Sequence, residues 1–431
     1  MIEVQKPKVV LITYVWPEPL SSAAGLRDMN LIDSILWAGW DLIVASPSVQ
    51  NSYSDQLIQR GIRIHGVHAN DPEFDLWIKS EAPSLVIFDR FVFEEQFGWR
   101  VQENCPDAVR VLDTQDLHFL RRTRAKAIQI GKSELGKVSL VSEALEVGSK
   151  EFMNEDTFRE IASLYRCDGI FVLSRFEYDL LISQFNFSRD VLSLSRFQYP
   201  DPAPTPGFED RDHFMMIGNF RHAPNEDGVR WLIHEIWPLI RRRLPNVSLD
   251  IYGAYPSKEM MALTSKKEGI FVRGPISDHL EVLRSHRVNL APLRFGAGIK
   301  GKISDGWWAG TPVVATSIGA EGMSDSYSFG GLIADSAEDF AEAAVRLFQE
   351  EKEWAAQQQS GIQLIQALYS LEINRAELVH FLAFLLSNRG ELRSRNWLGA
   401  MLDYHSMRST RYFSKWIEEK SKRLGNNVSL N

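Results

Sequence analysis

Short runs of β-branched and other apolar residues alternate with longer amphipathic stretches along this chain. The first series of runs lies at residues 9–13, 42–45, 62–64, 85–88, 109–112 and 170–173. A second series lies at residues 214–217, 248–252, 270–272, 288–291 and 312–315. Strands that alternate with helices pair in parallel and are covered on both faces, so the pattern predicts two sets of parallel strands with helices around them.

A segment dense in proline separates the two series. Proline stands at every second position from Pro200 to Pro206, which excludes both a helix and a central strand there. A chain of 431 residues also exceeds what one hydrophobic core commonly supports. We therefore expect an α/β protein with two Rossmann-like, doubly wound domains and an interdomain cleft. The expected parts are a first domain at 1–200, a linker at 201–212, a second domain at 213–370 and a helical tail at 371–431 that packs back on the body.

Strand patterns stop after about residue 335, and helical patterns follow, among them 338–350 and 375–386. The segment 408–423 then combines arginine and lysine with Tyr412, Phe413 and Trp416. Two interpretations of this segment are open. It is either a helix packed on the body with its charges in solvent, or a peripheral contact with a membrane surface or a partner.

Composition excludes several classes of protein. A formal net charge of −8 argues against a nucleic-acid partner, because binding to phosphate backbones needs a clustered basic surface. The two cysteines, Cys105 and Cys167, are too few for a disulfide framework or a structural zinc site. The N-terminus lacks the features of a signal peptide, and no run approaches the ~20 apolar residues of a membrane span. We expect a cytoplasmic protein, peripheral at the inner face of the membrane if the second interpretation of the C-terminal segment holds.

The loop at 296–302 is the strongest candidate for a binding site. It follows the predicted strand at 288–291, contains three glycines and two lysines, and leads into a predicted helix. Glycines expose backbone N–H groups, and a helix start adds partial positive charge, so the loop is suited to bind an anion. Lys300 and Lys302 would add full charges. A tight turn with solvated lysines is the alternative.

Two common nucleotide motifs match this loop only in part. Gly296, Gly298 and Gly301 have the spacing of the dinucleotide fingerprint, but no acidic residue follows a second strand at the distance that a ribose contact needs. The loop also fits the first positions of a Walker A motif, but Ile303 stands where a hydroxyl must bind magnesium. Both assignments are therefore disfavoured.

Several segments, in their order along the chain, resemble the C-terminal domain of family 4 glycosyltransferases, the group 1 glycosyltransferases of the GT-B fold. These segments are 218–225, 237–238, 251–253, 274–276 and 296–320. The N-terminal half resembles the same family more loosely, through 112–118 and 168–174. The resemblance implies a GT-B architecture and a hexosyl or related transfer with retention of configuration. It further implies a UDP- or GDP-sugar as donor substrate, with no metal and no other cofactor.

The resemblance also assigns residues in the second domain. Lys300, Lys302 and Arg221 would neutralise the donor diphosphate, and the amides around Gly298 would contact the sugar or the β-phosphate. Asp305 would bind the ribose, and the backbone of Gly274 and Ile276 would contact the base. In many relatives a pair of glutamates eight positions apart frames the loop. Here the first of these places is held by Ala297 and the second by Asp305, so the usual acidic contact to the sugar is missing.

In the first domain, the loop after the first strand contains Gly25, where relatives often have two adjacent glycines. His118 follows a predicted strand end, on the side where open α/β sheets bind ligands. It is either the residue nearest the reacting sugar or a hydrogen-bonded structural histidine, and Asp116 would orient it or bind the acceptor. The basic residues just beyond form either a solvated face or a site for an anionic acceptor or lipid headgroup; they are Arg121, Arg122, Arg124 and Lys126.

Three functions follow, of which the first is favoured. The first is a glycosyltransferase that acts on a carbohydrate, lipid-linked or protein acceptor and uses the departing phosphate as the base. The second is a nucleotide-sugar epimerase or hydrolase, which needs paired carboxylates in the cleft. The third is a catalytically silent nucleotide-sugar-binding protein, suggested by Ala297 and the single glycine of the first loop. The sequence leaves the donor base, the sugar, the acceptor and the oligomeric state open.

Overall fold

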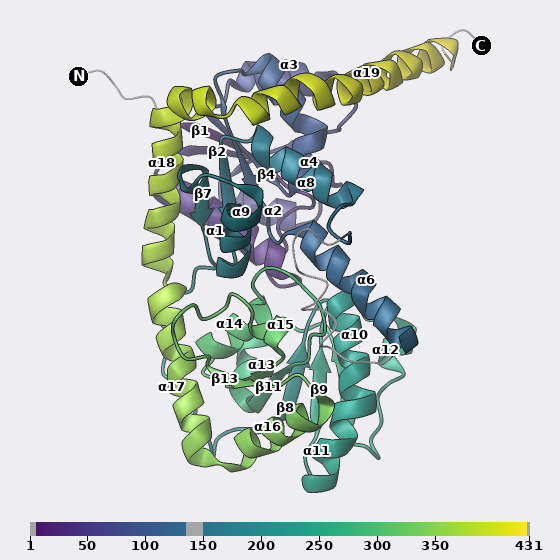
Figure 1. Cartoon of the computed structure of the whole chain (residues 1–431), viewed down its shortest axis with the longest axis vertical. Helices are drawn as coiled ribbons and strands as arrows, with labels where there is room; N and C mark the ends of the chain where they lie inside the picture. The colour runs from purple at the N-terminus through teal and green to yellow at the C-terminus, as the bar shows by residue number, and fades with distance from the viewer. Residues whose placement is uncertain (1–5, 135–149, 429–431) are drawn as a thin grey trace.

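The computed structural model describes residues 6–134 and 150–428 and contains two separate parallel sheets, stacked along the long axis of the molecule (Figure 1). The first sheet has the strand order β3-β2-β1-β4-β5-β6-β7, and the second has the order β10-β9-β8-β11-β12-β13. In both sheets the order reverses beside the first strand of the domain, so each half is doubly wound. The expected α/β fold class with two Rossmann-like domains is confirmed.

The first sheet comprises β1 (Lys8–Ile12), β2 (Asp41–Ser46), β3 (Arg63–Gly66), β4 (Leu85–Asp89), β5 (Val109–Asp113), β6 (Gly169–Val172) and β7 (Leu192–Leu194). The second comprises β8 (Asp212–Ile217), β9 (Leu249–Tyr252), β10 (Ile270–Gly274), β11 (His286–Ala291), β12 (Val313–Ala315) and β13 (Gly331–Ile333). The runs predicted from the sequence are all strands, with ends shifted by one or two residues. The strands β7 (LSL) and β13 (GLI) were not predicted, because each is three residues long and contains only two apolar residues.

The helices of the first domain are α1 (Ala23–Trp37), α2 (Ser52–Gln59), α3 (Glu73–Glu81), α4 (Phe91–Phe93), η1 (Glu94–Gly98), α5 (Trp99–Asn104), α6 (His118–Glu134), α8 (Glu155–Arg166), α9 (Arg175–Phe185) and η2 (Arg189–Val191). Those of the second are α10 (Ala223–Trp231), η3 (Leu232–Ile236), α11 (Trp237–Arg243), α12 (Lys258–Met261), α13 (His279–Ser285), α14 (Gly301–Trp308), α15 (Ser317–Ala320) and α16 (Ala337–Gln349). Several begin at a polar cap whose side chain accepts a backbone N–H, as Ser22 does for α1 and Asn154 for α8.

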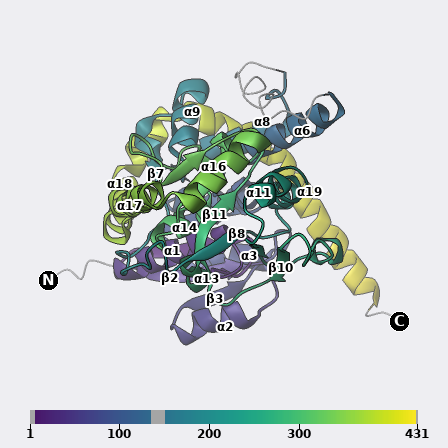
Figure 2. The ribbon, with the colours of Figure 1, turned by 90° about the horizontal axis from the view of Figure 1, so that it is seen from below.

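Alternation along β1 separates two cores of the first domain. Val9 and Leu11 point into a cluster that includes Leu31 and Ile35 of α1, whereas Val10 and Ile12 point into a second cluster on the other face. The view from below shows α2 and β3 at one edge of the molecule, in agreement with the place of β3 at the end of the strand order (Figure 2).

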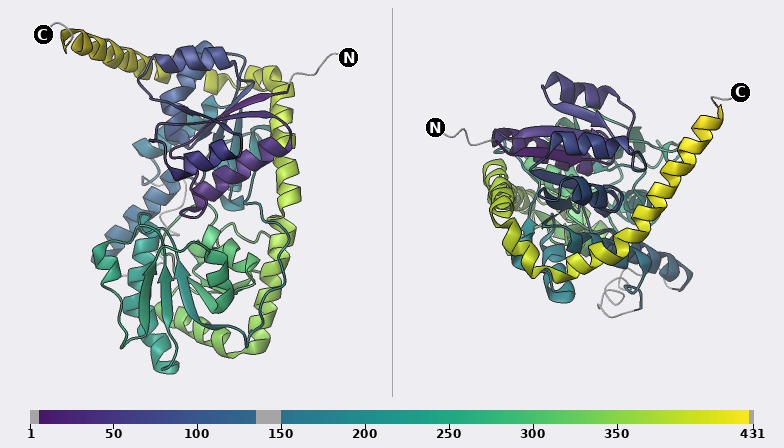
Figure 3. Two further views of the ribbon diagram at one scale, coloured as in Figure 1. Left: turned by 180° about the vertical axis from the view of Figure 1, so that it is seen from behind. Right: turned by 90° about the horizontal axis from the view of Figure 1, so that it is seen from above.

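Helices from the end of the chain complete both domains. α17 (Glu351–Leu368) packs on α14 of the second domain, and α18 (Leu371–Arg395) packs on α1 of the first. Leu378, Leu382 and Leu385 of α18 belong to the same buried cluster as α1. α19 (Trp397–Val428) then crosses the first domain, contacts α8 and α5, and extends beyond the body (Figure 3). No helix within the described residues is long and apolar enough to span a membrane.

Candidate active site

The carboxyl ends of the two sheets face each other, so loops of one domain contact loops of the other. Asn219, just after β8, donates a hydrogen bond of 3.2 Å from Nδ2 to the carbonyl of Ser21 in the loop after β1. The Tyr255 hydroxyl donates to Glu18 Oε2 at 3.1 Å. Open α/β sheets bind ligands at these ends, so the facing loops form the candidate site.

The glycine loop lies between β11 and α14 and reaches the first domain. Gly298 has a left-handed φ of +65°, and a Cβ placed on it would lie 2.9 Å from the Cβ of Asp116. Both the backbone conformation and the close approach therefore require glycine. The loop predicted from the sequence thus lies directly against the segment that carries Asp116 and His118.

Lys302 lies in the first turn of α14 and has one short polar contact. Its Nζ donates to Asn225 Oδ1 at 2.6 Å, and a Cβ on Gly218 would lie 2.9 Å from this ammonium. Burial lowers the pKa of Lys302 to about 7. The half-buried ammonium at a helix start is the arrangement that an anion would stabilise, because an opposite charge favours the protonated form.

Lys300 is more deeply buried and points back into its own loop. Its Nζ donates to the carbonyl of Gly298 at 2.8 Å, and burial lowers its pKa to about 8 against the opposing effect of Glu321. Its charge lies beside the glycine loop, but its ammonium is held by the loop carbonyl. The two lysines predicted to act together therefore have different partners in this structure.

Arg221 and His222 follow β8 and differ in their surroundings. The Arg221 guanidinium lies 3.8 Å from the centre of the Tyr255 ring and is exposed. His222 keeps an exposed surface although protein atoms surround it on most sides, and this crowding together with Arg121 lowers its pKa to about 4. Asp116 raises the pKa of His222 and Lys302 lowers it, so His222 belongs with the charged groups of the candidate site. Of the residues in the segment 218–225, only Arg221 was predicted from the sequence as a site residue.

His118 is the first residue of α6 and is largely buried. Its Nε2 lies 3.3 Å from Asp116 Oδ1, and its ring meets the Phe91 ring edge-on. Burial lowers the pKa of His118 to about 4, so the imidazole is neutral at pH 7. Nδ1 has no hydrogen-bond partner in the part of the chain that the structure describes.

Asp116 lies between His118 and Arg121. The Arg121 guanidinium donates from Nε to Asp116 Oδ2 at 2.6 Å. Arg121 and His118 hold the pKa of Asp116 well below its usual range in spite of its burial. Asp116 is therefore a carboxylate at neutral pH.

Two buried glutamates support this segment. Glu160 accepts from the N–H groups of His118 at 3.0 Å and Phe119 at 2.7 Å, and Glu177 accepts from the N–H of Leu117 at 2.8 Å. Burial raises the pKa of Glu160 to about 8 and that of Glu177 to about 7. Neither glutamate was selected from the sequence, because both lie more than forty residues from the backbone groups that they bind.

Asp305 lies on α14, and both of its oxygens have neighbours. The Tyr199 hydroxyl donates to Oδ1 at 2.7 Å, and Nε2 of His279 lies 3.6 Å from Oδ2. Asp305 raises the pKa of His279 above its ordinary value despite burial. Gly274 ends β10 with a φ of +79°, and its carbonyl accepts from Gly253 at 2.9 Å. Ile276 follows it and is half-buried.

Two expectations for the first domain were wrong. Gly25 lies in helix α1 and not in a loop, because the helix already begins at Ala23. Ser22 caps this helix by accepting a hydrogen bond from the N–H of Gly25. Arg124 is not on a solvated face: it is fully buried and pairs with Glu321 of the second domain at 2.7 Å. Arg121 and Arg122 also pair with carboxylates, Asp116 and Asp156, and Lys126 is exposed.

Metal ligands do not converge in the described residues. Within 6–134 and 150–428, no group of three or more His, Cys, Asp or Glu side chains is placed so that it could hold a metal ion. Cys105 is half-buried, Cys167 is buried, and both are free thiols.

Comparison with known proteins gives one match in sequence and several in structure. Residues 211–350 match the family model described as glycosyl transferases group 1. No curated protein matches the chain. The matched residues contain the glycine loop, both lysines, Arg221, His222 and Asp305.

Solved structures of low sequence identity match the whole architecture. A sucrose-phosphate synthase from Thermosynechococcus elongatus is 15% identical with a TM-score of 0.66, over 89% of this chain and 100% of that chain. HepE from Anabaena, in complex with UDP and glucose, is 10% identical with a TM-score of 0.63, over 88% and 99%. TarM of S. aureus, in complex with fondaparinux, alpha-GlcNAc-glycerol and UDP, is 11% identical with a TM-score of 0.62, over 87% and 99%. These likenesses show that the fold is GT-B.

Proposed function

Since this chain is a glycosyltransferase whose second domain belongs to the group 1 family, we propose that it moves a sugar from a nucleotide donor to an acceptor hydroxyl with retention of configuration and without a metal. One observation carries this proposal. The glycine loop with Lys302 at the start of α14 faces the Asp116–His118 segment of the other domain, with Gly298 and Asp116 in contact.

The donor diphosphate lies, in this proposal, at the start of α14. Lys302 exchanges its contact with Asn225 for a phosphate oxygen, and loop amides other than that of Gly298, whose N–H is bound to Glu177, add further donors. Lys300 contributes charge from behind the loop, and Arg221 approaches from the end of β8. Together these charges stabilise the leaving nucleoside diphosphate, which is where a transferase without a metal needs positive charge.

The nucleoside is assigned to the adjoining part of the second domain. Asp305, held by Tyr199, accepts from the ribose hydroxyls. The backbone at Gly274 and Ile276 contacts the base. UDP is named with the structures of HepE and TarM, so UDP-sugars are the first donors to test and GDP-sugars the second.

The acceptor is assigned to the first domain, beside Asp116 and His118. In the transfer, the bond between the anomeric carbon and the leaving phosphate oxygen breaks, and the bond to the acceptor oxygen forms on the same face. The acceptor proton passes to the departing phosphate, so no side-chain nucleophile is required. His118, which is neutral at pH 7, donates to or accepts from a hydroxyl of the transferred sugar.

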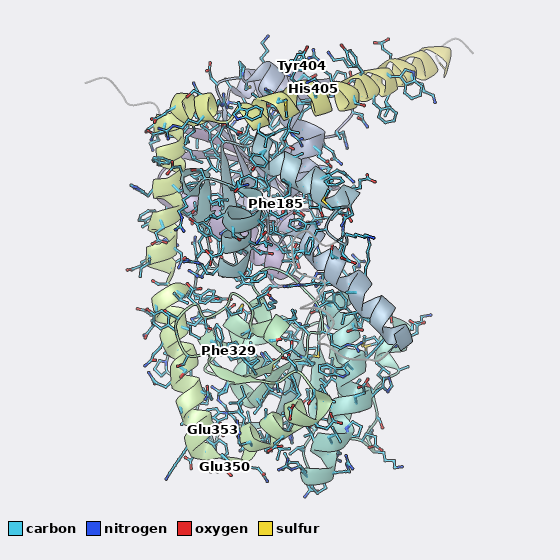
Figure 4. The ribbon with its side chains drawn as sticks, in the orientation of Figure 1. Phe185, Phe329, Glu350, Glu353, Tyr404 and His405 are labelled. Atoms are coloured by element: carbon cyan, nitrogen blue, oxygen red, sulfur yellow. The ribbon has the colours of Figure 1, made fainter. Side chains whose placement is uncertain are left out.

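A peripheral membrane contact of α19 is the second part of the proposal. The helix has several exposed apolar and aromatic side chains, namely Trp397, Met401, Tyr404, Tyr412, Phe413 and Trp416. Its other side is tied to the body by ion pairs of Asp403 with Arg110 and of Glu418 with Arg100. Figure 4 shows Tyr404 and His405 on the part of α19 that crosses the first domain. An interfacial helix of this kind suits a lipid-linked acceptor and a cytoplasmic enzyme bound at the inner face of the membrane.

A thermal-shift screen followed by a turnover assay tests the proposed reaction. A sugar nucleotide at a hundred times its dissociation constant stabilises the fold by about 2.7 kcal/mol, which identifies the donor base. Incubation of that donor with carbohydrate, lipid-linked and protein acceptors should then release the nucleoside diphosphate with formation of a glycoside. Binding without turnover would favour the silent binding protein. Conversion of the donor without an acceptor would favour the epimerase or hydrolase.

A further inference from the structure

Glu177 joins the two loops of the candidate site through one carboxylate oxygen. It lies on α9 of the first domain and is fully buried. Its Oε1 accepts from the N–H of Leu117 at 2.8 Å and from the N–H of Gly298 at 2.9 Å. One acceptor atom therefore contacts the His118 segment of its own domain and the glycine loop of the other domain.

The first domain holds the glycine loop at a second point. Arg124 donates from Nη1 to the carbonyl of Gly296 at 2.7 Å and pairs with Glu321. Gly296 and Gly298 have no side chains that could fix the loop within the second domain. The loop is therefore held from the first domain by a carboxylate and a guanidinium, in addition to the bond that Lys300 of its own domain makes to the Gly298 carbonyl.

The burial of Glu177 makes its hydrogen bonds to Leu117 and Gly298 costly to lose. A buried carboxyl group must find donors, since an unsatisfied one costs about 1–3 kcal/mol or more. Burial and Asp116 raise the pKa of Glu177, while the two N–H groups and Lys300 oppose this effect. Loss of Glu177 would leave the amides of Leu117 and Gly298 without this acceptor.

We propose that Glu177 is a positioning residue of the transfer reaction, which fixes the glycine loop of the donor domain against the His118 segment. The inference rests on the proposed glycosyltransferase function. Glu177 acts through the two loops and does not contact the reacting atoms. Its role is to keep the donor diphosphate at a fixed distance from His118. This matters because displacement of reacting groups by about 1 Å can lower the rate a hundredfold.

Glu160 offers a matched control on the same segment. It is as deeply buried as Glu177 and accepts from His118 and Phe119, but its two backbone contacts both lie within the first domain. Replacing Glu160 by alanine perturbs the start of α6 and leaves the bond to Gly298 in place. A difference between the two variants at the glycine loop therefore reports the link between the domains.

Hydrogen exchange and steady-state kinetics on Glu177→Ala, Glu177→Gln and Glu160→Ala test the proposal. Glu177→Ala should speed amide exchange in both 115–119 and 296–302, and it should lower kcat roughly ten- to a hundredfold. Affinity for UDP, measured on the whole protein, should change less than about threefold, since Lys302 remains. Glu177→Gln should restore most of kcat because its amide oxygen still accepts. Glu160→Ala should speed amide exchange in 115–119 and leave exchange in 296–302 unchanged.

Two results would overturn the inference. One is exchange at 296–302 in Glu177→Ala that equals that of the wild type. The other is a loss of kcat in Glu160→Ala and Glu177→Ala of the same size, with no rescue by glutamine. Failure of the wild type to turn over any sugar nucleotide would instead refute the proposed function, and the exchange data would still decide whether Glu177 links the loops.

Discussion

Arg124 and Glu321 form an ion pair that connects the two domains. Nη1 and Nη2 of the fully buried guanidinium lie 2.8 and 2.7 Å from the two oxygens of Glu321. Removing one partner of a buried pair leaves an uncompensated charge and costs about 3–5 kcal/mol, discounted here because Glu321 keeps 16% of its side-chain surface exposed. Urea unfolding of Glu321→Ala should show a loss of about 2–4 kcal/mol.

Arg122 supplies the control for this prediction on the same helix. It pairs with Asp156, but 43% of its side-chain surface is exposed. Exposed pairs contribute about 0–1 kcal/mol, so Arg122→Ala should change the free energy of unfolding only slightly. Equal losses in Glu321→Ala and Arg122→Ala would show that the pair between the domains has no special weight.

His118→Ala tests the role of the histidine near the sugar. The variant should lower kcat by about a hundredfold, at the lower end of the range for one hydrogen-bonding or acid–base contact. Affinity for nucleoside diphosphates should be nearly unchanged, because the diphosphate is assigned to the other domain. Kinetics with the donor found in the screen, together with calorimetry of UDP, measure both. Full turnover in the variant would make His118 a structural residue packed against Phe91.

The pKa of Glu160 predicts how stability depends on pH. Burial raises the pKa of Glu160 to about 8. At pH values between its ordinary pKa and 8, Glu160 therefore keeps its proton in the folded protein but has lost it in the unfolded chain. Rising pH therefore favours unfolding in that window. The wild type should lose more free energy of unfolding between pH 5 and pH 8 than Glu160→Gln does. Urea titrations at both pH values measure this; equal changes in the two proteins would contradict the raised pKa.

Vesicle binding tests the surface of α19. Trp416→Ser combined with Phe413→Ser should reduce co-sedimentation with vesicles that contain phosphatidylglycerol by about tenfold or more, because each buried aromatic side chain contributes about 1.5–3 kcal/mol. Trp37→Ser, which removes an equally exposed aromatic from α1, is the control. Equal binding of both variants and of the wild type would exclude these side chains as the membrane contact.

Local patterns in the sequence predicted most of the fold, and contacts between distant residues explain what they did not predict. Apolar runs gave the strands from β1 to β12 except β7, since a buried strand is marked by its own residues. Glycine density marked the loop at 296–302. Glu177 could not be found in this way, because its bond to Gly298 joins residues 121 positions apart. Arg124 was expected on a solvated face because its partner Glu321 lies 197 positions away in the sequence.

Lys302 and Asp305 are predicted to affect different parts of the donor. The pKa of Lys302 lies near 7 in the free protein, and a diphosphate should raise it, so UDP binding at pH 8 should take up a proton in the wild type and not in Lys302→Met. Asp305→Ala should weaken the binding of uridine and of UDP by the same factor, since its assigned partner is the ribose. A loss confined to UDP would place Asp305 at the phosphate.

Calorimetric titration of UDP and GDP into the wild type, Lys302→Ala and Lys302→Met tests the assignment of the donor site most directly. A charge-assisted contact contributes about 1.5–3 kcal/mol, so both variants should bind the preferred nucleotide roughly ten- to a hundredfold more weakly and remain folded. Methionine has a similar length without the charge, so similar losses in both variants would attribute the effect to charge. Unchanged affinity in both variants would contradict the assignment and make the loop at 296–302 a turn with its donor site elsewhere.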